Sequence, residues 1–166
     1  MAFHRTFADE QNKVYGSLCS YDSRNRFIQI TYRSQQTGAK VNRVIKCLIQ
    51  LHIAQEETKF GFSAEECREM LAAGEWKHLD NVQICGLMGM ASNTDDTEQI
   101  DREFCSLNKL FKELKETYFP ESDNFCELSM GMSHDYHQAI AEGSTLVRVG
   151  SKISEKEIIS ISFIIK

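Results

Sequence analysis

Apolar runs of strand length alternate with helical patterns from Arg43 to Gly150. Four of the runs predict strands, at 44–54, 82–90, 125–128 and 146–149. The first is nearly continuous in apolar, β-branched residues, which is typical of a strand that is covered on both faces. Strands that alternate with helices indicate βα units and a parallel sheet.

Three helical patterns separate these strands. Ser63 and Glu66 form a capping box, and the helix that follows is expected to bury Cys67, Met70 and Leu71 and to end at Gly74. An apolar stripe at spacings of three and four predicts a long helix, which Pro120 is expected to end. The residues of this stripe are Ile100, Phe104, Leu107, Phe111, Leu114 and Tyr118. Residues 135–142 predict a short helix that ends at Gly143.

The pattern fits two α/β architectures. Three βα units and a fourth strand make about half of a (β/α)8 barrel, or alternatively a small open doubly wound sheet. The chain has 166 residues, of which 42% are hydrophobic, enough for one sizeable core. A complete barrel takes roughly 200 residues or more, so a barrel would be incomplete here.

Charge and hydropathy exclude some classes of function. The net charge of −5 and the pI near 5.6 argue against a protein that binds nucleic acid through its overall electrostatic field. They do not exclude a local basic patch that binds nucleic acid. The longest apolar runs fall far short of the roughly 20 residues that a membrane span requires, and the N-terminus has no apolar signal core. We expect a soluble, cytoplasmic protein without a membrane partner.

The cysteines indicate neither disulfides nor a metal site. They stand in apolar or helical stretches and form no CxxC pair: Cys19, Cys47, Cys67, Cys85, Cys105 and Cys126. We interpret them as buried thiols. His134, Asp135 and His137 lie at spacings that do not share one helix face, which does not favour a metal site.

Candidate chemistry lies after the third and fourth strands, because parallel α/β folds gather function at the carboxyl ends of their strands. Ser133 follows Gly131 and is expected to open a helix, where it would bind an anion or serve as a plain N-cap. Gly150 and Ser151 offer further N–H donors, or form a simple turn. Arg148 stands inside an apolar strand, so it faces either a ligand or the surface. Together these residues predict a phosphorylated ligand at the last two strands.

Four segments carry a resemblance to a known family: HIAQEETKFGFS (52–63), GLMGMAS (86–92), ELSMGMSHDYHQAI (127–140) and EGSTLVRVGSKI (142–153). They resemble the YggS/PROSC family of pyridoxal-phosphate-binding proteins, whose fold is related to the N-terminal barrel of alanine racemase. The resemblance spans Val41 to Ile153. It implies the C-terminal portion of a (β/α)8 TIM-type barrel and a role in pyridoxal phosphate homeostasis without established catalysis.

The resemblance also implies a binding site for pyridoxal 5'-phosphate. In the family, residues matching Ser133, Gly150 and Ser151 bind the cofactor phosphate, and the residue matching Arg148 lies by the pyridine nitrogen. An arginine there keeps the nitrogen unprotonated, which makes the cofactor a poor electron sink. The resemblance implies no catalytic residue and no metal ligand in this chain.

One departure from the family concerns its Schiff-base lysine. That lysine lies on an early strand, upstream of every matched segment, and no lysine of this chain stands in a matching position. We therefore expect pyridoxal phosphate to bind non-covalently at best. Two alternatives remain open: a racemase-like enzyme dependent on pyridoxal phosphate, and a non-functional pseudogene product. The oligomeric state is also open.

The two ends of the chain differ from the family. Residues 1–40 show no clean element pattern and carry six basic and three acidic side chains. Codons can be chosen for them so that reading one base later yields a family-like stretch with the signatures FIGxLQxNK and IDSxKLL. We hypothesise an out-of-frame segment at 1–40, a partial pyridoxal-phosphate-binding barrel at 41–153 and an aberrant tail at 154–166. A real, divergent N-terminal extension is the alternative.

Overall fold

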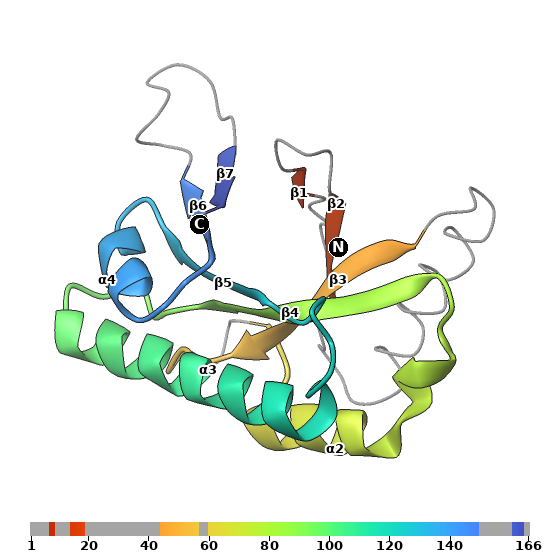
Figure 1. Cartoon of the computed structure of the whole chain (residues 1–166). Coiled ribbons are helices and arrows are strands. Elements are labelled where there is room, and N and C mark those ends of the chain that lie inside the picture. Colours follow the sequence, from red (N-terminus) through yellow and green to blue (C-terminus); the bar gives the residue numbers. More distant parts are fainter. Residues whose placement is uncertain (1–6, 9–13, 19–43, 57–59, 150–160, 165–166) are drawn as a thin grey trace.

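The chain folds around one seven-stranded sheet (Figure 1). The structure is a computed structural model that describes residues 7–8, 14–18, 44–56, 60–149 and 161–164. Its strands are β1 (Phe7–Ala8), β2 (Val14–Leu18), β3 (Ile45–His52), β4 (Val82–Met90), β5 (Glu127–Met132), β6 (Leu146–Val149) and β7 (Ile161–Ile164). Strands β2 to β6 are parallel neighbours in chain order, and β1 and β7 pair antiparallel at the two edges.

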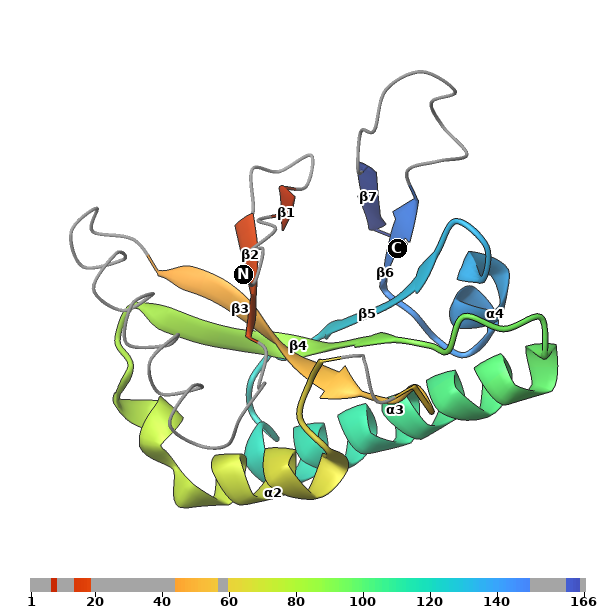
Figure 2. The same cartoon turned by 180° about the vertical axis from the view of Figure 1, so that it is seen from behind.

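The helices lie on one side of this sheet. They are α2 (Ala64–Ala73), the 3₁₀ helix η1 (Glu75–His78), α3 (Thr97–Tyr118) and α4 (Tyr136–Ala141). Figures 1 and 2 show the sheet curling away from the helices, so that β1 with β2 and β6 with β7 rise on its concave side. Sequential parallel strands with helices on the convex face alone make an incomplete barrel, because a doubly wound sheet carries helices on both faces.

The main core lies between the sheet and the helices. Alternate residues of β3 point towards α2 and α3, as the period of two in a strand requires. The buried cluster between these layers includes Cys47, Ile49, Leu51, Cys67, Leu71, Phe104, Leu107 and Leu114. A smaller buried cluster covers the other, concave face and comprises Leu48, Cys85, Met88 and Leu146. The first predicted strand is thus covered on both faces, as expected.

The ends of the first two helices confirm the sequence predictions. Ser63 Oγ accepts a hydrogen bond from the Glu66 backbone N–H at 3.1 Å, and Glu66 Oε2 accepts one from the Ser63 backbone N–H at 2.8 Å. Gly74 ends α2 in the left-handed conformation, with φ 74°. The long helix α3 ends at Tyr118, two residues before Pro120.

The third strand differs from the prediction, whereas the short helix agrees with it to within one residue at each end. The sequence predicts a strand at 125–128, but Phe125 precedes β5 and stacks on Phe119, with ring centroids 4.2 Å apart. The strand instead continues through Gly131, where a register shift marks a bulge against β6. A Cβ at Gly131 would lie 2.6 Å from the Ala139 Cβ, so only glycine allows α4 to pack this closely.

The first forty residues contain strands that the sequence did not indicate. The structure describes β1 and β2 there, and β2 pairs in parallel with β3. The physical reason is that the edge of β3 offers unpaired backbone groups, which a neighbouring segment satisfies regardless of a weak apolar pattern. The strand predicted at 44–54 is also shorter, at Ile45–His52.

Candidate functional site

The candidate residues meet where the parallel strands end. Met132, the last residue of β5, is the register partner of Arg148 in β6. The turn that begins at Ser133 therefore lies next to the end of β6. Gly150 and Ser151 fall outside the described residues, so their role in phosphate binding stays a prediction.

Arg148 lies on the concave face and reaches across two strands. It stands two residues after Leu146, which belongs to the concave cluster, and so it shares that face. Its Nη1 donates to Ser129 Oγ at 2.9 Å and to the Ser129 carbonyl at 3.4 Å, and its Nη2 donates to the Gly89 carbonyl at 3.2 Å. The guanidinium thus spans β5 and β4 on the inside of the curled sheet, and the alternative of an outward surface position is wrong.

The described hydrogen-bond partners of the Arg148 guanidinium are neutral groups. Burial lowers the pKa of Arg148 to about 10, and the nearby Asp135 carboxylate acts in the opposite direction. The side chain therefore remains a cation at neutral pH. In the part of the chain that the structure describes, no carboxylate forms an ion pair with it.

Ser133 lies in a turn and does not open the helix. Helix α4 begins at Tyr136, and Asp135 occupies the N-cap position. Asp135 is 1% exposed, and its Oδ1 accepts a hydrogen bond from the Met132 backbone N–H at 2.6 Å. This local bond tightens the chain directly after β5 and delays the helix. The prediction that Ser133 opens the helix, and with it the alternative of a plain N-cap, is wrong, whereas its role in phosphate binding stays a prediction.

Ser129 and Asp135 are two further polar residues of this site. The sequence did not single out Ser129, and it raised Asp135 only as a possible metal ligand. Ser129 is 2% exposed, and its hydroxyl is an acceptor for Arg148. The signal was available in the sequence, because a serine within the apolar run ELSMGM raises the same question as an arginine within LVRV. The sequence does not show that Ser129 is the partner of Arg148, because that contact depends on the order of the strands in the sheet.

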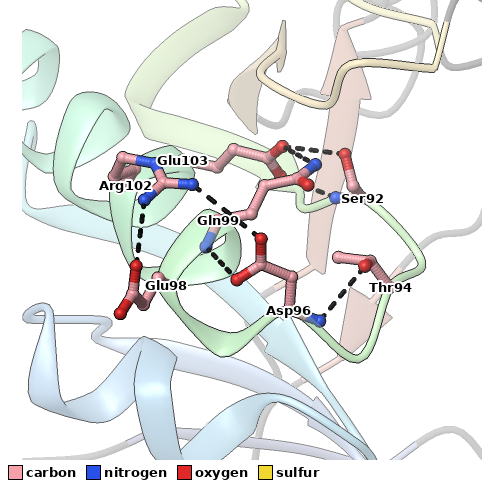
Figure 3. Close-up of polar contacts among 7 residues, drawn as sticks. All are labelled: Ser92, Thr94, Asp96, Glu98, Gln99, Arg102 and Glu103. Carbon is pink, nitrogen blue, oxygen red and sulfur yellow. Dashed lines mark hydrogen bonds and ion pairs between the residues drawn. The ribbon is translucent and has the colours of Figure 1, made fainter.

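A buried glutamate organises the loop that follows β4 (Figure 3). Glu103 of α3 is 8% exposed, and its carboxylate accepts hydrogen bonds from the Ser92 backbone N–H at 2.7 Å and the Ser92 hydroxyl at 2.8 Å. Gln99 Nε2 donates a third bond at 3.0 Å. The same serine hydroxyl accepts from the Gln55 backbone N–H at 3.0 Å. One carboxylate therefore ties the loops after β3 and β4 to α3.

Three histidines lie near the same edge of the sheet, His52 at the end of β3 and His134 and His137 after β5. His52 Nε2 lies 2.9 Å from the Glu56 carbonyl, consistent with a structural contact at the end of β3. His134 Nε2 lies 3.4 Å from Asp135 Oδ2, and the His137 ring contacts that of Tyr136. Within the described ranges, no three histidine, cysteine or acidic side chains gather as a metal site would require.

A cavity opens at the opposite edge of the sheet. It has a volume of about 700 Å³, and Val44, Val82 and Tyr118 contribute to its lining. These residues lie at the amino ends of β3 and β4 and near the end of α3. Because barrels place chemistry at the carboxyl ends of their strands, we assign the candidate site to the edge that carries Arg148.

Among the described helices, none is long and apolar enough to cross a bilayer.

Comparison with known proteins identifies relatives that match most of the chain. Residues 28–154 match the family described as alanine racemase, N-terminal domain. The chain is 32% identical over 160 residues to the pyridoxal phosphate homeostasis protein of Helicobacter pylori strain 26695, covering 91% of this chain and 65% of that protein. It is 36% identical over 118 residues to the protein of the same name from Aquifex aeolicus, covering 70% and 49%. The chain thus spans less than two thirds of the length of these curated relatives.

Solved structures give the same result. The PipY protein of Synechococcus elongatus, solved without pyridoxal phosphate, superposes with a TM-score of 0.70 at 28% identity, over 84% of this chain and 60% of that one. The structure of the same protein with pyridoxal phosphate bound superposes with a TM-score of 0.67 at 26% identity, over 84% of this chain and 59% of that one. The family match begins before Val41, in the segment where the sequence alone showed no resemblance. The resemblance to the YggS/PROSC family is confirmed, and the chain belongs to the alanine racemase N-terminal domain family.

Proposed function

We propose that this chain is a cytoplasmic protein that binds pyridoxal 5'-phosphate without a covalent bond and acts in pyridoxal phosphate homeostasis, as its curated relatives are named. The observation that carries the proposal is the guanidinium of Arg148. Neutral partners hold it on the concave face, and among the described residues no carboxylate forms an ion pair with it.

The residues present fit this cofactor. Arginine has only donors, so a pyridine nitrogen that faces Arg148 acts as an acceptor and stays unprotonated. Ser133 lies next to the end of β6, on the same edge, where it would bind the phosphate together with Gly150 and Ser151. When bound, pyridoxal phosphate supplies an aldehyde and an electron-withdrawing ring. Arg148 limits that withdrawal, which favours storage of the cofactor over catalysis.

The lysines favour non-covalent binding. The proposal rests on the expectation that no lysine of this chain occupies the family's Schiff-base position. Lys46 lies in β3, six residues before His52 at the carboxyl end of the same strand, a separation of about 20 Å along a strand. This is beyond the reach of a side chain, so Lys46 would not meet a cofactor that is bound beside Arg148. The racemase-like alternative needs such a lysine and a second acid or base.

The experiment is a titration with pyridoxal phosphate, followed by absorbance and equilibrium dialysis. The full chain is expected to bind, and Arg148→Met is expected to lose about tenfold or more in affinity, because it removes charge-assisted hydrogen bonds while keeping the apolar length. Arg68→Met is the matched control, since Arg68 is exposed and pairs with Glu113 on the helix face. Equal affinity of Arg148→Met and the unaltered chain would contradict the proposal.

The absence of a covalent link is tested separately. The chain is incubated with pyridoxal phosphate, reduced with borohydride and digested, and its peptides are weighed by mass spectrometry. We expect no lysine peptide to carry the cofactor in stoichiometric amount. A single lysine that is fully modified would show instead that the chain forms a Schiff base, and would favour the racemase-like alternative.

A further inference from the structure

A buried hydroxyl lies beneath the guanidinium of Arg148. Ser129 is flanked in register by Met88 of β4 and Leu146 of β6, two members of the apolar concave cluster. Its Oγ accepts from Arg148 Nη1 at 2.9 Å, and its carbonyl accepts from the same nitrogen at 3.4 Å. Apolar neighbours exclude competing water, so this charge-assisted bond fixes the guanidinium firmly.

A competing anion lies close by. Asp135 is buried, and its Oδ1 accepts from the backbone N–H of Met132, the register partner of Arg148. A buried arginine beside a buried aspartate is expected to pair with it, because each then compensates the desolvation of the other. Here the two terminal nitrogens bond to Ser129 and Gly89 instead. Both groups thus have separate hydrogen-bond partners.

We infer that Ser129 is a positioning residue: it holds the Arg148 guanidinium over the concave face and away from Asp135, so that its charge stays available to the ring nitrogen of a ligand. The inference deepens the proposed function and rests on it for the identity of the ligand. Without the Ser129 hydroxyl, the guanidinium is free to swing towards Asp135. An Arg148 that is paired with Asp135 would hold the pyridine nitrogen less well.

The first experiment compares Ser129→Ala with Ser129→Thr, which keeps a hydroxyl. Ser129→Ala is expected to weaken pyridoxal phosphate binding about tenfold and to shift the pH dependence of the bound cofactor's absorption spectrum, which reports protonation of the ring nitrogen. Ser129→Thr is expected to retain the spectrum of the unaltered chain. Ser144→Ala is the matched control, because Ser144 is an equally buried hydroxyl that bonds backbone groups such as the Met130 carbonyl at 2.8 Å. It is expected to lower stability without moving the pH profile.

The second experiment needs no cofactor. Unfolding equilibria of the unaltered chain, Ser129→Ala, Arg148→Met and the double variant form a double-mutant cycle. We expect a coupling of about tenfold in the unfolding equilibrium constant, as for a hydrogen bond to a charged group. Ser144→Ala combined with Arg148→Met should show additive effects.

The outcomes separate the inference from the proposed function. Coupling between Ser129 and Arg148 in a chain that binds no pyridoxal phosphate supports the positioning role and overturns the function. Binding that requires Arg148, with Ser129→Ala unchanged in affinity and pH profile, overturns the inference alone. Additive effects of Ser129→Ala and Arg148→Met on the unfolding equilibrium also overturn the inference.

Discussion

At the scale of single residues, burial sets the chemistry of the cysteines. Burial raises the pKa of the Cys47 and Cys67 thiols to about 12 and that of the Cys85 thiol to about 11. All five cysteines in the described ranges are free thiols. Cys126 is exposed and Cys105 is half-buried, so the prediction of buried thiols holds for three of the five. Cys126 differs because it lies just before β5, where the chain is still at the surface.

Alkylation at about pH 8 is expected to distinguish these thiols. Cys126 should react first with iodoacetamide, whereas Cys47, Cys67 and Cys85 should stay unlabelled while the chain is folded, because a raised pKa leaves almost no thiolate at that pH. Peptide mass spectrometry measures the labelling, and the unfolded chain in denaturant is the control. Rapid labelling of Cys47 or Cys67 in the folded chain would contradict the buried assignment.

The same thiols predict how stability depends on pH. Their folded pKa lies above the value of 9.0 for an unperturbed thiol, so the folded state holds these protons more tightly than the unfolded state. Their contribution to stability is complete below about pH 9 and is lost as the pH rises towards 12. Thermal melting between pH 8 and about pH 11 should therefore show a falling melting temperature. Replacing Cys67 by alanine should flatten this dependence, and an equally steep fall in that variant would count against it.

At the scale of elements, the helices were predicted well and the loops were not. The capping box at Ser63 and the apolar stripe of α3 are local patterns, and local hydrogen bonds or a single buried face decide them. Glu103 also lies within α3, but the partners that bury its carboxylate, Ser92 and Gln99, are known only from the structure. A glutamate is by default an exposed residue. Glu103 nevertheless stands three residues after Ile100 and four before Leu107, so the helical spacing places it on the apolar stripe.

Glu103→Gln is expected to lower the free energy of unfolding by about 1 to 3 kcal/mol, because it weakens charge-assisted bonds to Ser92 in a buried setting. The measurement is chemical denaturation. Glu116→Gln is the matched control on the same helix, where the side chain is exposed and the expected change is within about 0.5 kcal/mol. Equal effects of the two substitutions would show that the Glu103 carboxylate does not stabilise these loops.

At the scale of the whole molecule, the curl of the sheet decides what the strands can do. Because β2 to β6 follow one another in parallel and the described helices pack on the convex face, the inner face is left for Arg148 and its partners (Figure 1). The periodicity of the sequence fits a half-barrel and an open doubly wound sheet equally well. The sequential strand order and the placement of the described helices on one face separated them, and both depend on contacts between distant segments.

We propose that the chain divides into an out-of-frame segment at 1–40, a partial barrel at 41–153 and an aberrant tail at 154–166. The nucleotide sequence of the gene tests this division. Translation of the nucleotides for residues 1–40 in the other two frames should yield a family-like peptide with the FIGxLQxNK signature. The measurement is resequencing of the gene from its source. If neither alternative frame contains such a peptide, the segment is a divergent part of the protein and the hypothesis is wrong.

The sequence by itself determined the α/β class, four of the strands to within a few residues and the capped helices, and it singled out Arg148 as a charge within an apolar strand. It could do so because periodicity, caps and a charge within an apolar run are encoded by neighbours in the chain. Only the tertiary structure decided that Ser129 and Gly89 hold Arg148, that Glu103 is buried and that β2 joins the sheet. Each of these depends on which strands pair and in which register, and backbone hydrogen bonds between distant segments carry no sequence signature of their own.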